Sequence, residues 1–397
     1  MIDATAVEAV NTMTARWARA AVADEGTAFA ATGVWPLLAL LAGGADGPAR
    51  QELAGALGVG ADGATALGGR LLGALDAMDG VHAATGLWTR QDLPIRPEWE
   101  AELPPGVRST LTGDAERDRK ELDGWASRRT RCAIAEMPVP LTPDTRLVLA
   151  GALTVETAWL QPFQPGWLRP ASGPWRDRSL AGLTRSTDDL DGVLRVVPDT
   201  PAGPLTLSGV AGGNGLDVHL VLGAEDAPGG EVLEAGIRAV AGGYAGWPGS
   251  ALPPGEAGPG VRVMEVPSWD PTPRATLTTP QFTVTARHDL LRRAELFGLR
   301  TAQDTARGHF PGISPAALAL SSAEQSMTAS FSAEGFRAAA VTAFALAPGS
   351  APPQRTAKLI SVAYDRPFGF LAVHRATGLV LTAGWVTDPE PGADTMW

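Results

Sequence analysis

The hydrophobic positions of the first eighty residues recur at three- and four-residue intervals, which is the spacing of one face of an α-helix. This pattern predicts four helices, at residues 6–22, 35–41, 48–57 and 64–77. Pro48 suits the start of the third helix, because an N–H in the first turn has no partner within the helix. The N-terminal region is therefore predicted to be helical.

After residue 80 the pattern changes to short apolar runs rich in β-branched and aromatic residues. Two more helices are predicted, at residues 97–103 and 119–131. The predicted strands are residues 81–89, 147–159, 216–222, 261–266, 276–285, 368–374 and 379–386. A tight turn at residues 375–378 joins the last two strands, with Gly378 supplying a positive φ. The order of elements predicts an α+β fold.

Stretches rich in glycine and proline lie at residues 198–204, 211–215 and 242–259. Strand-like sequence resumes on both sides of each stretch, so we interpret them as surface loops and not as linkers between domains. No internal repeat is evident. A single domain spanning residues 1–397 is predicted.

Composition excludes several classes of protein. Hydrophobic residues make up 45% and charged residues 19% of the chain, enough apolar surface for a large core and too little charge for disorder. The formal charge of −11 argues against nucleic acid as a partner. The most apolar segment, residues 34–42, is too short to cross a membrane, and Arg16 and Arg19 interrupt any signal-peptide core. We therefore expect a cytoplasmic protein, and the single cysteine, Cys132, excludes an intrachain disulfide.

Signatures of enzymes and metal sites are absent from the sequence. Residues 58–63 match G-x-G-x-x-G, but they follow a predicted helix and not a strand, which argues against a phosphate-binding turn. The five histidines are scattered and lack the spacing of metal ligands. No G-x-S-x-G, H-E-x-x-H or C-x-x-C motif occurs. We expect no catalytic residue, no metal and no cofactor.

Several segments together carry a resemblance to one family. They include Leu-Asp-Gly-Trp at 122–125, Thr-Pro-Gln-Phe at 279–282, Ala-Glu-Gly-Phe-Arg-Ala-Ala-Ala-Val-Thr-Ala at 333–343 and Asp-Arg-Pro-Phe-Gly-Phe-Leu at 365–371. In this order and near this spacing they resemble the landmarks of the serpin family, over almost the whole chain. Two lysines against thirty arginines, with abundant Ala, Gly and Pro, are typical of a GC-rich genome and suggest a bacterial serpin.

The resemblance implies a helical N-terminal region, three β-sheets and an exposed reactive-centre loop at about residues 335–360. It implies a serine protease inhibitor that acts by suicide cleavage, in which the cut loop inserts into the main sheet as a new strand and carries the acyl-enzyme with it. The hinge of that loop matches seven residues: Glu334, Gly335, Phe336, Ala338, Ala339, Ala340 and Thr342. The implied partner is a subtilisin-like or trypsin-like serine protease, bound by a monomer.

The composition of the hinge suits insertion independently of the family. Gly335 and the alanines at 338–340 are small, and alternate residues from Phe336 to Leu346 form a mostly apolar face. An alanine-rich stretch could also form a helix or an ordinary loop. The bait bond stays open, because counting from the two ends of the loop gives different answers. The candidate residues for the bond are Gly349, Ser350, Arg355, Thr356, Lys358 and Leu359.

Two departures from the family pattern keep a second function open. Phe336 stands where the family has a small residue, and a bulky ring there is expected to slow entry into a closed sheet. The polar cluster that closes the sheet is altered, with Ala30 and Gly33 in place of serines, Gly151 in place of Asn and Gln325 in place of His. The alternative is a non-inhibitory serpin-fold protein that is used inside the cell for binding or for biosynthetic catalysis.

Overall fold

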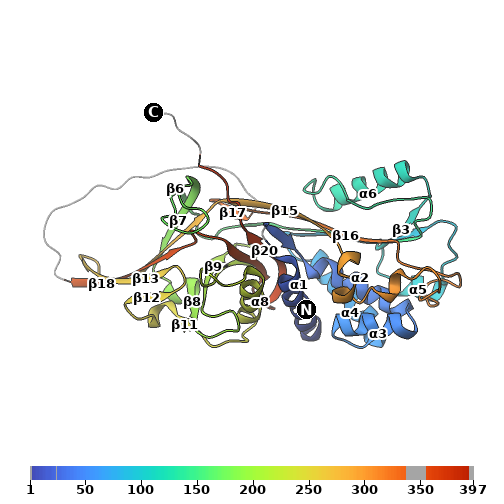
Figure 1. The fold of residues 1–397 in the computed structure, drawn as a ribbon, viewed down its shortest axis with the longest axis horizontal. Coiled ribbons are helices and arrows are strands. Elements are labelled where there is room, and N and C mark those ends of the chain that lie inside the picture. Colours follow the sequence, from blue (N-terminus) through green and yellow to red (C-terminus); the bar gives the residue numbers. More distant parts are fainter. Residues whose placement is uncertain (1, 24, 337–354, 393–397) are drawn as a thin grey trace.

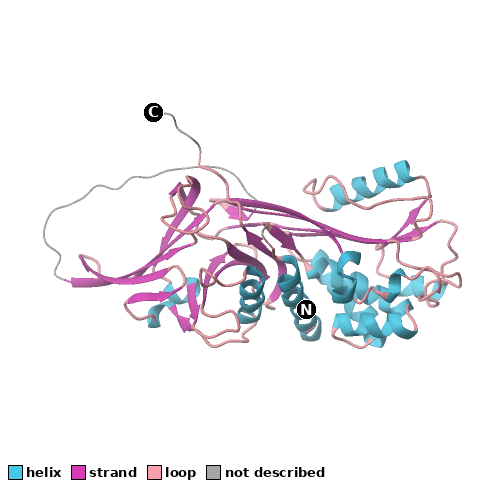
Figure 2. Ribbon diagram, in the orientation of Figure 1, coloured by secondary structure: helices cyan, strands magenta, loops and turns pink. Residues whose placement is uncertain are grey.

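The computed structural model describes residues 2–23, 25–336 and 355–392. Several helices gather at one end of the molecule, others lie near its middle, and strands run along its whole length (Figure 1, Figure 2). Within the described residues, no helix is long and apolar enough to cross a membrane. The prediction of an α+β fold with a helical N-terminal region is confirmed.

The helices begin and end where the sequence provides caps. Asp46 and Asp114 accept hydrogen bonds from backbone N–H groups in the first turns of α3 and α6, and Gly58 ends α3 in the left-handed conformation at φ 72°. All four predicted N-terminal helices are confirmed as α1 to α4. The helices are α1 Ala4–Ala21, α2 Ala31–Gly44, α3 Gly47–Leu57, α4 Ala61–Asp76, α5 Pro97–Glu102, α6 Ala115–Arg129, α7 Leu190–Val193, α8 Gly229–Val240 and α9 Ala294–Phe297.

One sheet, here called the long sheet, carries the family's main landmarks. Its strands are β2 Val81–Arg90, β3 Arg108–Leu111, β4 Leu147–Val155, β5 Thr157–Ala158, β15 Phe282–Asp289, β16 Ser322–Phe331 and β17 Gly335–Phe336. The order is β3-β2-β4-β16, with β15 on the far side of β16. β4 and β16 pair in parallel from Val148 with Ser322 to Leu153 with Met327, and we call this ladder the lower seam.

Two further sheets complete the described fold. The first runs β1 Thr27–Phe29, β20 Leu379–Val386, β19 Phe368–His374, β10 Leu216–Leu222, β9 Leu205–Ala211, β8 Leu194–Val197 and β11 Trp247–Pro248. The second, here called the end sheet, runs β12 Gly255–Gly258, β13 Val261–Ser268, β18 Arg355–Ala363, β14 Arg274–Pro280, β7 Leu180–Thr187 and β6 Gln164–Leu168. The predicted hairpin of β19 and β20 is confirmed, with Gly378 at φ 70°. Residues 242–259, interpreted from the sequence as a loop, contain β11, β12 and a short 3-10 helix η1 (Gly249–Ala251).

The two faces of the long sheet are covered differently. Helices α2 to α4 lie on one face and α6 lies on the other (Figure 1). Trp125 of α6 meets Trp88 of β2 edge to face, with ring centroids 5.8 Å apart. A Cβ atom on Gly86 would lie 2.8 Å from the Trp125 ring, so glycine is needed there for the helix to approach the sheet.

Candidate functional site: the hinge, the seam and the anchor

Two residues of the predicted hinge, Gly335 and Phe336, form a short strand at the end of the long sheet where β16 ends. In β17, Gly335 is the partner of Ala158 and Phe336 is the partner of Thr157 on β5, while Phe336 also pairs antiparallel with Phe331 on β16. A Cβ atom on Gly335 would lie 2.4 Å from the Thr157 carbonyl oxygen, so only glycine fits this position. We call this region, β5-β17-β16, the upper seam.

The backbone before β17 is held in place residue by residue. The N–H of Trp159 donates to the carbonyl of Glu334 (2.9 Å), and the N–H of Phe163 donates to the carbonyl of Ala333 (2.7 Å). The indole N–H of Trp159 donates to the carbonyl of Ser332 (3.0 Å). Residues 332–336 are thus fixed at the point where a further strand would enter.

The ring of Phe336 lies inside the protein. It is 2% exposed, and its centroid is 6.0 Å from that of Phe370. Phe331, its neighbour on β16, stacks on Phe282 (5.4 Å) and contacts Trp159 (4.9 Å). The sequence suggested that this ring would slow entry into the sheet. In the structure the ring is already buried among aromatic side chains.

The lower seam is closed by an amide instead of the family's polar cluster. Gln325 is fully buried; its Oε1 accepts from the N–H of Ala30 (2.9 Å) and its Nε2 donates to the carbonyl of Ala30 (2.8 Å). Gly151 is its Cα partner across the seam, and a Cβ atom on Gly151 would lie 3.2 Å from the carbonyl oxygen of Gly33. The substitutions that the sequence showed as losses therefore belong to one arrangement, in which small residues leave room for the Gln325 amide.

His288 lies beside Gln325 on the outer strand of the same sheet. Its Nε2 is 2.9 Å from the carbonyl oxygen of Ala28, and its ring packs edge to face on Trp17. Burial lowers the pKa of His288, so the ring is neutral at pH 7 and its Nε2–H donates to Ala28. The lower seam is therefore connected to the segment before α2 through both Gln325 and His288.

The far end of the predicted loop is a regular strand. Residues 355–360, which the sequence assigned to the loop, lie in β18, paired with β13 from Arg355 onward and with β14 only from Leu359 onward. Arg355, Thr356, Lys358 and Leu359 are therefore in a ladder. The other predicted positions, Ala338, Ala339, Ala340, Thr342, Gly349 and Ser350, lie outside the described residues.

Lys358 is an anchor that sequence reasoning did not recognise. Its Nζ lies 2.7 Å from the carbonyl oxygens of Ser250 and Leu252 and 3.5 Å from that of Gly249. A lysine that donates to these carbonyls is not free to enter the binding pocket of a trypsin-like enzyme. The only signal in the sequence was the rarity of lysine, and that does not reveal the carbonyls at residues 249–252.

Comparison with known proteins decides the family. A family profile described as serpin (serine protease inhibitor) matches residues 6–171 and 264–389, well over half of the chain. The chain belongs to the serpin family.

Individual relatives are distant. The protein Ipis-1 of Ixodes persulcatus is 27% identical over 117 residues, a match that spans 28% of this chain and 30% of that relative. Solved serpin structures match nearly end to end. Serpin48 of the insect Tenebrio molitor is 20% identical with a TM-score of 0.72, covering 98% of this chain and 99% of that one. Human thyroxine-binding globulin complexed with thyroxine is 16% identical with a TM-score of 0.72 over the same shares, and protease nexin-1 with heparin is 18% identical with a TM-score of 0.71, covering 97% and 99%. At these identities the likeness shows the fold alone.

A buried arginine supports the top of this serpin's long sheet. Arg185 of β7 is 6% exposed, and its guanidinium lies 4.9 Å from the ring centroid of Phe163. It donates to the carbonyls of Gln161 (3.2 Å) and Gly209 (3.3 Å), and burial lowers its pKa. It holds the segment between β5 and β6 against β9, and so keeps the upper seam in position.

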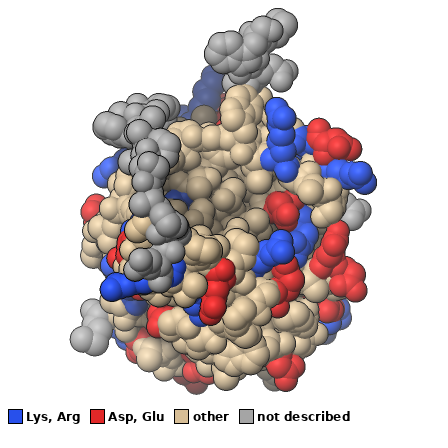
Figure 3. All heavy atoms as spheres, turned by 90° about the vertical axis from the view of Figure 1, so that its left-hand side faces the viewer, with Lys and Arg blue, Asp and Glu red and all other residues tan. Residues whose placement is uncertain are grey.

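The described part of this serpin contains no group of three or more His, Cys, Asp or Glu side chains suited to a metal ion. The candidate site therefore has three parts. The long sheet contains the two-residue strand β17 at one end and the buried amide of Gln325 in its middle, and strand β18 is anchored by Lys358. The end of the molecule where β18 begins is hollowed, with few charged side chains inside the hollow (Figure 3).

Proposed function

We propose that this serpin inhibits a serine protease by being cut between residues 337 and 354, after which the chain following Phe336 enters the long sheet between β4 and β16. The observation that carries the proposal is β17. It is a strand of two residues already paired on both sides at the mouth of the seam. A chain that inserts from there would extend the existing β17 and would not have to form its first pairings with β5 and β16.

The existing pairings align with each other when they are extended. If β17 continues in its present register, Ala338 comes to lie between Val155 and Ala329, and Ala340 lies between Leu153 and Met327. Leu153 and Met327 are partners in the closed seam, so both flanking strands can receive the new strand without a change of register. Alternate residues then face the core, and the set is largely apolar.

The same register limits the length of the inserted strand and the position of the cut. β4 begins at Leu147 and β16 at Ser322, so the new strand runs out of partners at about residue 346. Pro348 has no N–H to donate. About ten new residues at about 1 kcal/mol net for each hydrogen bond, with added apolar burial, give on the order of 10 kcal/mol. A bait bond beyond residue 346 suits this limit, and Gly349-Ser350 meets it.

The test is incubation with a subtilisin-like and a trypsin-like protease, followed by denaturing electrophoresis. A covalent complex that resists SDS, together with a large rise in melting temperature of the nicked protein, is the expected result. Ala340→Arg puts a charge on the face directed at the core and should give cleavage without a complex. Ala339→Arg puts the same charge on the opposite face and is the matched control. Clean cleavage of the wild type with no rise in melting temperature would exclude insertion.

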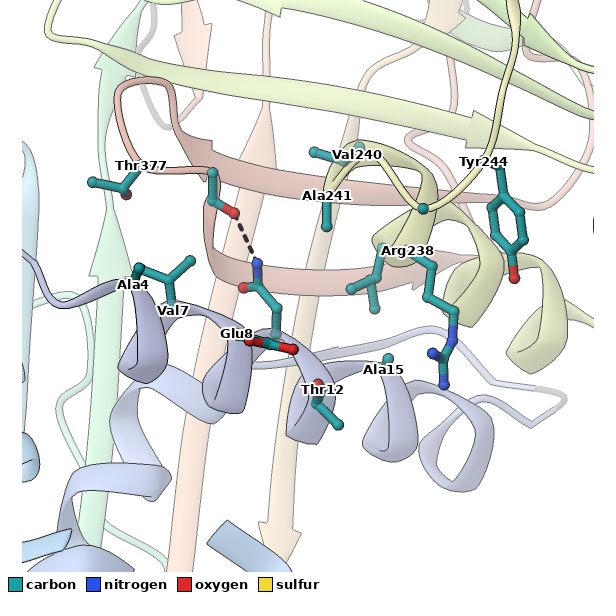
Figure 4. A pocket seen from close by; sticks show the side chains of 14 residues that line it. Ala4, Val7, Glu8, Thr12, Ala15, Arg238, Val240, Ala241, Tyr244 and Thr377 are labelled. Carbon is teal, nitrogen blue, oxygen red and sulfur yellow. Dashed lines mark hydrogen bonds between the residues drawn. The ribbon is translucent and has the colours of Figure 1, made fainter. Parts of the chain in front are cut away.

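A second candidate function, binding of a small molecule, is favoured by one pocket. A cavity of about 560 Å³ lies between α1, α8 and the β19–β20 turn (Figure 4). Its lining combines apolar Val7 and Val240 with the polar ends of Glu8, Arg238 and Tyr244, a mixture typical of sites for partly apolar ligands. Thyroxine-binding globulin, a neighbour in fold, was solved with thyroxine.

This candidate is tested with the fluorescent anion 8-anilinonaphthalene-1-sulfonate as the probe. Saturable binding of one molecule per chain, lost in an Ala241→Trp variant that fills the cavity, would support a carrier. Binding unaffected by that variant, or no saturable binding, would leave the protease inhibitor as the function.

A further inference from the structure

A buried acidic side chain lies on the lower seam, outside the hinge and the Gln325 arrangement. Glu324 of β16 is 7% exposed. Its Cα partners are Ala150 on β4 and Asp289 on β15, so its side chain shares a face of the sheet with both. Among the described residues no ion pair joins Glu324 to a basic side chain. A carboxyl group therefore lies between two strands that must separate if anything enters the sheet.

The neighbours of Glu324 make a charge there unfavourable. On one side Ala150 belongs to an apolar cluster with Met137 and Val139 of the segment after α6. On the other side the carboxylate of Asp289 is held in place, since it accepts from the N–H of Leu291 (2.9 Å) and pairs with Arg292 (3.4 Å). Like charges on directly opposed residues of a ladder destabilise it.

These surroundings decide the protonation state. Burial first, and then the charge of Asp289, raise the pKa of Glu324 to about 8, although Arg292 and the hydroxyl of Ser322 act in the opposite direction. In the closed sheet Glu324 is therefore neutral at pH 7. Asp289 and Arg292 are the charged groups that contribute to this shift, whereas Ala150 of β4 and Met137 and Val139 of the segment after α6 present apolar side chains.

We propose that Glu324 couples the parting of β4 and β16 to the release of a proton, so that the seam stays closed in acid and opens more readily as the pH rises toward mildly alkaline values. When the strands part, water reaches the carboxyl group and it ionises. The device concerns the seam itself and goes beyond the inhibitory function, because it operates whether or not a protease is present.

The direction and range follow from linkage. The closed sheet keeps the proton up to about pH 8, whereas a solvated glutamate loses it near the ordinary value of 4.5. Between these two values each opening event releases a proton, so the equilibrium constant for opening rises by up to about ten-fold per pH unit. Above about pH 8 both states are ionised and the dependence levels off.

The experiment compares hydrogen exchange of the backbone amides in the lower seam in the full chain and in Glu324→Gln, at a series of pH values from 5 to 9. The ratio of the two proteins at each pH removes the intrinsic dependence of exchange on pH. The ratio of wild type to variant should increase steeply between pH 5 and 8 and then become constant. Amides of β19 and β20 should show no such change.

Two further variants keep the result interpretable. Asp289→Asn removes the opposing charge while Glu324 stays buried, so the rise should begin at the same pH but level off at a lower one. Glu295→Gln changes an exposed carboxylate and should leave the wild-type profile intact. A ratio that does not vary with pH, or an Asp289→Asn profile identical to that of the wild type, would overturn the proposal.

Discussion

The upper and lower seams of the long sheet are held together by different means, although β16 borders both and β5 follows β4 directly in the chain. In the upper seam β5 and β16 stand apart and β17 lies between them, fixed by backbone hydrogen bonds and by the buried ring of Phe336. In the lower seam β4 and β16 are joined directly, and Gln325 connects them to the start of α2. Along β16 the sheet therefore has an upper part that already contains an extra strand, β17, and a lower part in which β4 and β16 pair directly. Both parts share one register. Opening the lower seam therefore requires breaking the hydrogen bonds between β4 and β16 but no change in the register of either strand.

The sharpest way to break this comparison is to remove the amide from the lower seam. Gln325→Leu should lower the free energy of unfolding by about 3 kcal/mol, because the buried N–H of Ala30 loses its partner Oε1 and the carbonyl of Ala30 keeps only the bond from the N–H of Gly33. Urea denaturation with an unchanged m-value measures the loss. Gln51→Leu, on the exposed side of α3, is the control, and equal losses for both variants would show that Gln325 does not close the seam.

Removing the aromatic ring from the upper seam should have a smaller and more local effect. Phe336→Ala is expected to cost about 2 kcal/mol, less than a deeply buried ring usually costs, because β17 can detach while the rest stays folded. Hydrogen exchange should speed up at Trp159 and Phe163 and stay unchanged in the lower seam. Phe336→Leu should restore most of the protection. Faster exchange throughout the sheet in the alanine variant would mean that the two seams are not independent.

The smallest effect is expected at the anchor of β18, which supports neither seam directly. Lys358→Met should lower the free energy of unfolding by about 1 kcal/mol, since it removes contacts with backbone carbonyls but keeps most of the side chain. Thermal unfolding measures the change. Lys120, the other lysine, has a side chain that is 78% exposed, and Lys120→Met should change nothing. A Lys358 variant as stable as the Lys120 variant would argue against an anchor.

The parts that could be predicted from the sequence are those in which local chemistry decides the conformation. Helices α1 to α4 follow from apolar periodicity, and the β19–β20 hairpin follows from Gly378 at its turn. Gly335 was predicted to belong to a hinge from its neighbours in the motif, and the structure adds that a side chain there would meet the Thr157 carbonyl. That last contact could not be predicted, but the other features have local causes. These features depend on few residues close in sequence.

The parts that could not be predicted depend on distant partners. β16 reads Ser-Ala-Glu-Gln-Ser-Met-Thr-Ala-Ser-Phe, which has too few apolar residues to predict a central strand, although most of its residues are buried in the structure. Gln325 appeared to be the loss of a family residue, since its partner Ala30 lies 295 positions away. Lys358 was interpreted as a possible cleavage site because the carbonyls that it contacts, at residues 249–252, are also far away in the sequence.

The anchor at Lys358 gives the two ends of a nicked chain unequal freedom. In the proposed reaction, the new carboxyl terminus lies at the end of the segment that follows β17, and β17 itself is a strand of two residues. The fragment with the new amino terminus leads into β18, which stays bound along β13 and through the lysine. A serine protease remains esterified to the acyl side of the bond it cuts. The enzyme is therefore attached to the end that can travel, while the leaving amine stays where the cut was made and cannot follow it to reverse the reaction.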